Sequence, residues 1–333
     1  APLSVTSYVT QFAPSIPHSA SGTVRGDQPR MLRETFLFLS RNRTLRRWME
    51  TSPAAARLPR RFIAGQRLED AIAVARLLLD ENILSTLDHL GENVTSADEA
   101  AAARSCIEQA LDAIAAASLP STVSIKLTQF GLDIGDSLCR ANVETVLLKA
   151  KAIGSRVEID MESSEYVDRT LRIVEDFHRA NGSLRAVLQA YLYRTHDDLR
   201  RLNALRVPVR LCKGAYNEPP SVAWPRKSDV DASYARLARI LVEEGEDPAF
   251  ATHDPRMIDI VLEHAARNGR APSSFEFQML YGVRRDLQKM LVSSGFRLRL
   301  YVPYGNAWYP YFMRRLAERP ANVLFILRNL FRH

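Results

Sequence analysis

Eight short runs of apolar and β-branched residues, each followed by a longer segment of helical character, constrain the fold of this chain more than any other feature. A helix is predicted over 96–117, which opens with Ser96 and Glu99 at the spacing of a capping box, and another over 230–244. Strands are predicted at 86–90, 123–127, 156–161, 186–192, 207–213, 249–253, 275–280 and 297–302. Eight alternations over about 240 residues match a closed parallel barrel.

A doubly wound open sheet is the competing architecture, but the chain has no GxGxxG turn and no GxxxxGK[ST] loop to hold phosphates. We therefore predict an α/β fold, a distorted TIM-like (βα)8 barrel over 85–333. An N-terminal helical arm is expected at 30–84, because apolar residues recur at helical spacing in 31–49 and 61–79. Residues 1–29 are rich in Ser, Pro and Thr without such a period, which predicts a flexible leader.

Composition excludes several classes of protein. The chain has 45 Lys+Arg against 38 Asp+Glu, a net charge of +7, but its basic residues are spread out, which favours an anionic ligand over nucleic-acid binding. Cys106, Cys139 and Cys212 have no close spacing, so we expect neither a disulfide framework nor a CxxC metal site. Such cysteine usage is typical of a protein in the reducing cytoplasm. No apolar run approaches the roughly 18 residues of a membrane span, and no export signal opens the chain. We expect a protein that is neither membrane-spanning nor exported.

Polar residues stand at or just beyond the end of each predicted strand, where a barrel places its chemistry. Buried strands normally carry Val, Ile and Leu, so charges here must pair with one another or with a ligand. One such pair, Lys126 with Asp160, is also explained as a structural ion pair, whereas the whole series favours a ligand site. The series is Glu92, Lys126, Asp160, Gln189, Arg210 with Lys213, Thr252 with His253, Gln278 and Tyr301.

His253 lacks the His, Cys and carboxylate neighbours of a metal site, so we predict no catalytic metal. The last segment, 301–320, contains four tyrosines within eleven residues, which favours a pocket wall. A helix from about Asn306 would place Tyr311 one turn before Arg314 and Arg315, two guanidinium groups able to grip one carboxylate. Alternatively, Glu318 pairs with both arginines on a solvated face.

A series of motifs in the right order resembles the bacterial monofunctional proline dehydrogenases over residues 30–330. The motifs are VSIKLTQFGLDI (123–134), VEIDME (157–162), VLQAYLYR (187–194), VRLCKGAYNEP (209–219), FATHD (250–254), FEFQMLYGV (275–283), YVPYG (301–305) and WYPYFMRRLAERPANV (308–323). The resemblance implies FAD across the strand ends and L-proline against its isoalloxazine ring. It also implies hydride transfer that yields Δ1-pyrroline-5-carboxylate, the first step of proline catabolism to glutamate, with electrons passed to a membrane quinone.

The same resemblance implies a role for each matching residue. Asp160 is similar to the catalytic carboxylate, and Arg210 to the arginine placed at the flavin. Cys212 stands where an aliphatic residue is expected, and we assign it no chemistry. Glu92 resembles an acidic gate that pairs with Arg210. The implied substrate site is Lys126, Tyr301, Arg314 and Arg315, with Tyr216, Tyr304 and Tyr311 around the pyrrolidine ring; the implied flavin contacts are Met161, Gln189, Lys213, Gly214, Ala215, Thr252 and His253.

Other hypotheses stay open at this point. A Schiff-base aldolase would use Lys126 or Lys213 as its nucleophile, and an RNA-binding protein would use the basic N-terminal arm. The C-terminal segment 321–333 combines an apolar stripe with Arg328, Arg332 and His333. It is interpreted either as a peripheral contact with the anionic inner face of the membrane or as a last helix that packs on the barrel.

Overall fold

The computed structural model describes residues 61–91, 94–309 and 311–313. The predicted leader, most of the predicted arm, Glu92, Arg314, Arg315 and the segment 321–333 lie outside the described residues. Within the described part, no helix combines the length and the apolar character that crossing a membrane requires.

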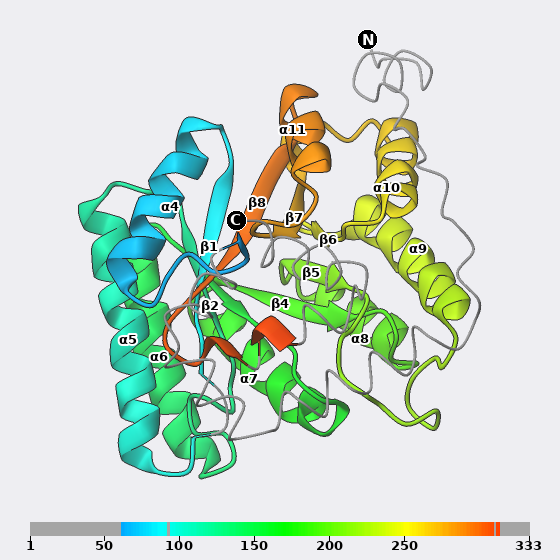
Figure 1. The fold of residues 1–333 in the computed structure, drawn as a ribbon. Coiled ribbons are helices and arrows are strands. Elements are labelled where there is room, and N and C mark those ends of the chain that lie inside the picture. Colours follow the sequence, from blue (N-terminus) through cyan, green and yellow to red (C-terminus); the bar gives the residue numbers. More distant parts are fainter. Residues whose placement is uncertain (1–60, 92–93, 310, 314–333) are drawn as a thin grey trace.

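The described residues form a closed barrel of eight parallel strands in chain order, as predicted. The barrel closes between its first and last strands, where Leu84 pairs with Arg299 and His89 with Tyr304; these two strands lie side by side in Figure 1. The strands are β1 (Leu84–His89), β2 (Thr122–Ile125), β3 (Val157–Ile159), β4 (Leu184–Gln189), β5 (Val209–Cys212), β6 (Ala249–Ala251), β7 (Glu276–Leu280) and β8 (Arg297–Tyr304).

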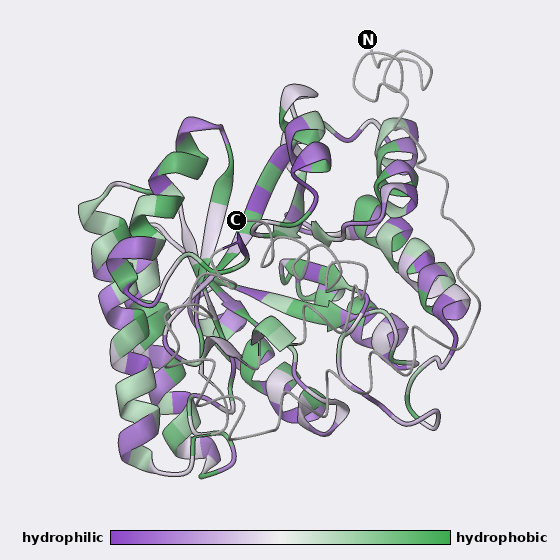
Figure 2. Ribbon diagram, in the orientation of Figure 1, coloured by the Kyte–Doolittle hydropathy of each residue, from purple (hydrophilic) through white to green (hydrophobic). Residues whose placement is uncertain are grey.

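Helices surround the barrel and bury their apolar faces against its outside. Figure 2 shows hydrophobic and hydrophilic residues alternating along these helices, as expected for elements with one face on a core and one in water. The α-helices are α4 (Leu68–Asp80), α5 (Ala97–Ala116), α6 (Asp136–Ala152), α7 (Val167–Ala180), α8 (Thr195–Ala204), α9 (Lys227–Glu244), α10 (Pro255–Arg267) and α11 (Arg285–Ser293), with short 3₁₀ turns η3 (Ser164–Tyr166) and η4 (Pro272–Ser274).

The predicted capping box before α5 forms only in part. The hydroxyl of Ser96 accepts a hydrogen bond from the backbone N–H of Glu99, as predicted. The carboxylate of Glu99, however, accepts from the backbone N–H and the hydroxyl of Thr95, so the returning bond falls one residue earlier than the motif predicts.

The helix predicted over 61–79 is shorter than expected and begins at Leu68. The residues before it serve the barrel instead: Phe62 and Ile63 are buried in an apolar cluster with Trp308 and other residues that follow β8. The backbone N–H of Ala64 donates to the carbonyl of Pro303 at 2.9 Å, which ties this stretch to β8. Tertiary contacts therefore override the helical spacing.

Several strands end before their predicted bounds, and the residues left over belong to the rim of the barrel. Lys126 and Asp160 each follow the last residue of a strand directly, β2 and β3 respectively. Lys213 and Thr252 do the same after β5 and β6. The C-terminal ends of the strands thus place these side chains at one end of the barrel, as the fold requires of a site.

Candidate active site

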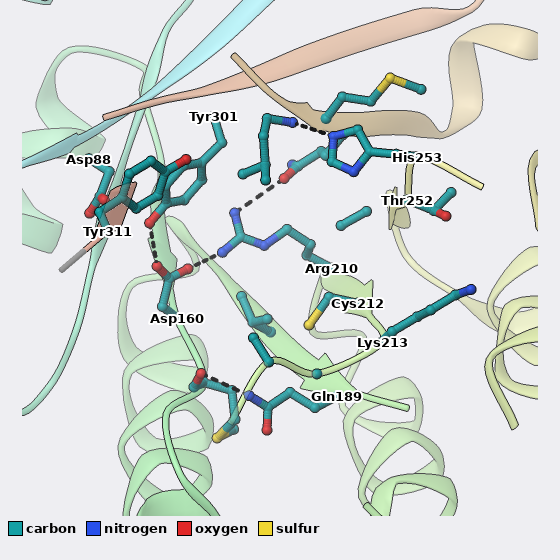
Figure 3. Close-up of a pocket in the computed structure, with 18 of the residues that line it drawn as sticks. Asp88, Asp160, Gln189, Arg210, Cys212, Lys213, Thr252, His253, Tyr301 and Tyr311 are labelled. Atoms are coloured by element: carbon teal, nitrogen blue, oxygen red, sulfur yellow. Dashed lines mark hydrogen bonds and ion pairs between the residues drawn. The ribbon is translucent and has the colours of Figure 1, made fainter. Parts of the chain in front are cut away.

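A cavity of about 960 Å³ opens at the C-terminal ends of the strands. Of the described residues in the predicted set, all but Tyr304 line it. Figure 3 shows the labelled side chains, among them Asp160, Gln189 and Arg210, around one space. The residues of the predicted set that line the cavity are Lys126, Asp160, Met161, Gln189, Arg210, Lys213, Gly214, Ala215, Tyr216, Thr252, His253, Tyr301 and Tyr311, together with Gln278 of the strand-end series.

Asp160 lies at the centre of a polar cluster in this cavity. Its carboxylate accepts hydrogen bonds from the hydroxyl of Tyr301 at 2.7 Å and from that of Ser124 at 2.8 Å, and it forms an ion pair with Arg210. Burial alone would raise the pKa of Asp160, but the charges of Arg210 and Lys126 and these hydrogen bonds hold it below its ordinary value. Asp160 is therefore an ionised acceptor at neutral pH.

Lys126 stands between two carboxylates. Its ammonium nitrogen lies 3.2 Å from Asp88 and 3.5 Å from Asp160, and also 3.5 Å from the hydroxyl oxygen of Tyr301. Burial opposes the charged ammonium, yet the nearby acids raise the pKa of Lys126 well above its ordinary value. Burial raises the pKa of Asp88. The predicted pairing of Lys126 with Asp160 is present, and Asp88 is a site residue that the strand-end series missed.

Arg210 is held on several sides. One terminal nitrogen donates to Glu158 at 3.0 Å and to the side-chain oxygen of Gln278 at 3.2 Å, while the other bonds Asp160. Its guanidinium carbon lies 5.5 Å from the ring centroid of Tyr301. Although burial disfavours the cation, the two carboxylates raise the pKa of Arg210. The predicted pairing of Arg210 with Glu92 lies outside the described residues.

A second layer of charged residues lies deeper in the barrel, and the strand-end series did not include it. Glu158, Arg185 and Glu276 have fully buried side chains, and that of Arg299 is 5% exposed. Three members of this deeper layer stand two positions before a residue of the strand-end series: Glu158 before Asp160, Glu276 before Gln278 and Arg299 before Tyr301. Side chains two apart in a strand share a face, so this spacing was the signal that could have found them.

Tyr304 corrects one expectation about the pocket wall. It is buried and packs against His89, with ring centroids 5.3 Å apart, and it is not among the described residues that line the cavity. Tyr301 lies three positions earlier in the same strand, so the two side chains leave opposite faces of β8. Of these two tyrosines, Tyr301 is the one that faces the barrel interior.

Comparison with known proteins decides the family. A family model described as proline dehydrogenase matches residues 71–328. The chain belongs to the proline dehydrogenase family. It is accordingly an oxidoreductase of proline catabolism.

Individual members of the proline dehydrogenase family match nearly the whole chain. Identity to proline dehydrogenase 1 of Bacillus subtilis (strain 168) is 40% over 301 residues, which cover 90% of this chain and 99% of that one. Identity to the proline dehydrogenase of Deinococcus radiodurans is 41% over 281 residues, 82% of this chain and 90% of that one. The residues that the family model matches, 71–328, include all eight strands of the barrel.

A solved structure shares the fold. It is proline utilization A from Bdellovibrio bacteriovorus inactivated by N-propargylglycine, with a TM-score of 0.77 at 23% identity. The match covers 90% of this chain but only 38% of that longer protein. At this identity the likeness supports the (βα)8 barrel alone.

The packing around position 214 requires a glycine there. Its φ is +107°, a conformation that residues with a side chain rarely adopt, and a Cβ at this position would lie 2.2 Å from the ring of Tyr191. The family resemblance implied only that Gly214 contacts the flavin. In the structure, the packing of Tyr191 beneath the 213–215 turn already excludes a side chain.

The remaining lining groups are mostly engaged by the protein itself. The ammonium of Lys213 pairs with Asp231 at 2.5 Å and Asp254 at 3.1 Å. Burial raises the pKa of the Cys212 thiol to about 11, so it stays protonated. A ring nitrogen of His253 accepts from the backbone N–H of Leu280 at 2.9 Å. No group of three or more His, Cys, Asp or Glu in the described part of the chain is arranged to hold a metal ion.

Gln189 differs from these groups. Its side-chain nitrogen donates to the carbonyl of Met161 at 3.1 Å, which fixes the amide at the cavity wall. Its side-chain oxygen is buried and has no hydrogen-bond partner in the described structure. A buried polar atom without a partner is costly, so this oxygen is poised to accept a hydrogen bond from a ligand.

Proposed function

We propose that this chain is an FAD-dependent proline dehydrogenase that oxidises L-proline to Δ1-pyrroline-5-carboxylate and passes the electrons to a quinone. One observation carries the proposal: in a member of this family, Lys126, Asp160, Arg210 and Tyr301 meet in one cavity, within hydrogen-bond or ion-pair reach of one another. The role of each residue follows the resemblance described above.

The cavity residues fit a flavin. Its volume of about 960 Å³ is near the upper end of the roughly 300–1,000 Å³ of small-molecule and cofactor sites. The unpartnered oxygen of Gln189 matches an imide N–H, a group that the flavin ring offers. Met161, Arg210, the Lys213–Gly214–Ala215 turn, Thr252 and His253 would hold the rest of the cofactor. FAD, when bound, supplies the acceptor for a hydride from C5 of proline.

The protein's part in the reaction is to bind and orient proline. Arg314 and Arg315 would hold its carboxylate, and Tyr216, Tyr301 and Tyr311 would enclose its ring. As the C5–H bond breaks, the lone pair of the neutral amine forms the N=C5 bond, so the amine must be unprotonated at that moment. The fixed charge of Arg210 favours the arrival of electrons beside it. Glu92 would close the site; Gly91, the residue before it, lines the cavity.

A visible absorption spectrum tests the proposal. The purified protein should be yellow with flavin bands, and L-proline added under argon should bleach them, because reduced flavin absorbs little there. A colourless protein, or flavin bands that proline leaves unchanged, would refute it.

The Schiff-base aldolase is less well supported, because such a lysine needs a lowered pKa. The pKa of Lys126 is raised, and Lys213 is paired with two carboxylates. Borohydride trapping of a carbonyl substrate on Lys126 or Lys213 would favour the aldolase instead.

A quinone assay tests the proposed electron acceptor. Reduced enzyme should be reoxidised by a short-chain quinone, and failure of this step would remove the quinone from the proposal.

Flotation with anionic liposomes, comparing the full chain with one truncated after Asn322, tests the proposed membrane contact of 321–333. Equal flotation of the two would remove the membrane contact.

A further inference from the structure

Oppositely charged side chains follow one another from the cavity down through the barrel interior. Each contacts the next, and none of the eight side chains is more than 12% exposed. Buried charges persist only where each has a partner, so removing one member alters its neighbours. In order, the members are Asp88, Lys126, Asp160, Arg210, Glu158, Arg185, Glu276 and Arg299.

Glu158 is the member that joins the cavity to the deep layer. One of its oxygens accepts from Arg210 at 3.0 Å, and the other accepts from Arg185 at 3.0 Å. The side-chain nitrogen of Gln278 lies 3.2 Å from the first oxygen and 3.4 Å from the second. Glu158 is fully buried, so no water competes for these bonds.

Glu158 and Asp160 together grip Arg210. They are two residues apart and therefore face the same side of the chain. Each takes a different terminal nitrogen of the guanidinium group. Figure 3 shows Arg210 extended across the cavity toward Asp160. The position of the guanidinium, and how much of its charge is balanced, thus depend on both carboxylates.

We propose that Glu158 is a positioning residue, which fixes the guanidinium of Arg210 and balances its charge, and so sets the reduction potential of a flavin beside Arg210. This rests on the proposed function, because it needs a flavin in the cavity. Loss of the Glu158 charge leaves Arg210 less compensated, and a more positive site stabilises the reduced, electron-rich flavin. The potential then becomes more positive.

Glu276 provides a matched control. It is also fully buried, pairs with Arg185, and accepts from the same nitrogen of Gln278 at 2.7 Å. No hydrogen bond or ion pair of the described structure joins it to Arg210. Glu158→Gln and Glu276→Gln each remove one negative charge from one network with little change of shape, but only the first touches Arg210.

The experiment measures the flavin midpoint potential and thermal unfolding of the full-length holoenzyme and its variants. We expect both glutamine variants to unfold at lower temperature, and the potential of Glu158→Gln to lie more positive than those of wild type and Glu276→Gln. Glu158→Asp, which keeps the charge, should lie between wild type and Glu158→Gln. Equal potentials in Glu158→Gln and Glu276→Gln, or an unshifted Glu158→Gln, would overturn the inference.

A second pair decides the matter if Glu158→Gln does not fold. Glu158→Asp cannot bridge Arg210 and Arg185 with its shorter side chain, so its potential should move positive, whereas that of Glu276→Asp should stay near wild type. Equal potentials in this pair would contradict the proposal. A wild-type protein without flavin would instead refute the proposed function, and this inference with it.

Discussion

Tyr301 donates a hydrogen bond from its hydroxyl to a carboxylate oxygen of Asp160 at 2.7 Å, across 141 residues of chain. The ammonium of Lys126 lies 3.5 Å from both groups. Burial raises the pKa of Tyr301 well above its ordinary value, so the phenol keeps its proton and remains a donor. The last strand of the barrel thus fixes the carboxylate that follows the third.

Replacing Tyr301 with Phe should lower kcat/KM for proline by about tenfold to a hundredfold. This substitution removes the hydrogen bond from Tyr301 to the charged carboxylate of Asp160. Hydrogen bonds to charged groups contribute about 1.5–3 kcal/mol. Steady-state kinetics with proline and an artificial acceptor measure the effect. Tyr304→Phe is the matched control, because the buried hydroxyl of Tyr304 has no hydrogen-bond partner in the described structure. Equal losses in the two variants would contradict the role of the Tyr301 bond.

Proline turnover should rise with pH through the alkaline range, as the substrate amine loses its proton. The pKa values of Lys126 and Tyr301 are raised well above their ordinary values of 10.5 and 10.0, so these groups keep their protons while the amine titrates. The value of kcat/KM for proline, measured from pH 6 to about 10, checks this. A flat profile of kcat/KM would show that the neutral amine is not the reacting species.

Replacing Gly214 with Ala should destabilise the fold by about 2 kcal/mol or more, because the new Cβ meets Tyr191 and the residue must keep a positive φ. Gly154→Ala separates these causes, since Gly154 also has a positive φ (+67°) but nothing within 4 Å of an added Cβ. We expect that control to cost about 1 kcal/mol. Chemical denaturation measures both, and equal losses would show that contact with Tyr191 is unimportant.

Replacing Asp254 with Asn should reduce stability at pH 7 by about 1–2 kcal/mol. Asn caps the N-terminus of α10 as well as Asp does, so the variant isolates the charge. Burial alone would raise the pKa of Asp254, but Arg256 and Lys213 lower it below the ordinary 3.8. A carboxyl group with a lowered pKa adds stability above pH 3.8, and this stability is lost as the pH falls. The unfolding free energies of wild type and Asp254→Asn should therefore converge on acidification.

Asp112→Asn is the control for that comparison, because Asp112 is 66% exposed and pairs only with Lys149 among the described residues. Its loss should stay within about 0.5 kcal/mol at pH 7. A difference between wild type and Asp254→Asn that persists unchanged to low pH would show that the charge is not its cause.

The amino-acid sequence by itself determined the barrel and the identity of most cavity residues. Both follow from local pattern: apolar runs mark the strands, and a polar residue such as Asp160 or Lys126 at the end of a run marks the rim. Because all strands of a parallel barrel end on the same side, the position of a residue in its own strand was enough to place it near the others. The predicted ends of the strands were less accurate, because the site residues lie just beyond the last residues of the strands.

Only the tertiary structure decided which groups meet. That Asp88 holds Lys126, that Glu158 grips Arg210 from below, and that Tyr304 turns away from the cavity all depend on strand register and on closure between β1 and β8. These contacts join residues tens to hundreds of positions apart, and no local pattern encodes such pairings. The sequence placed charges on a shared face, whereas the closed barrel, by excluding water, required each of them to find a partner.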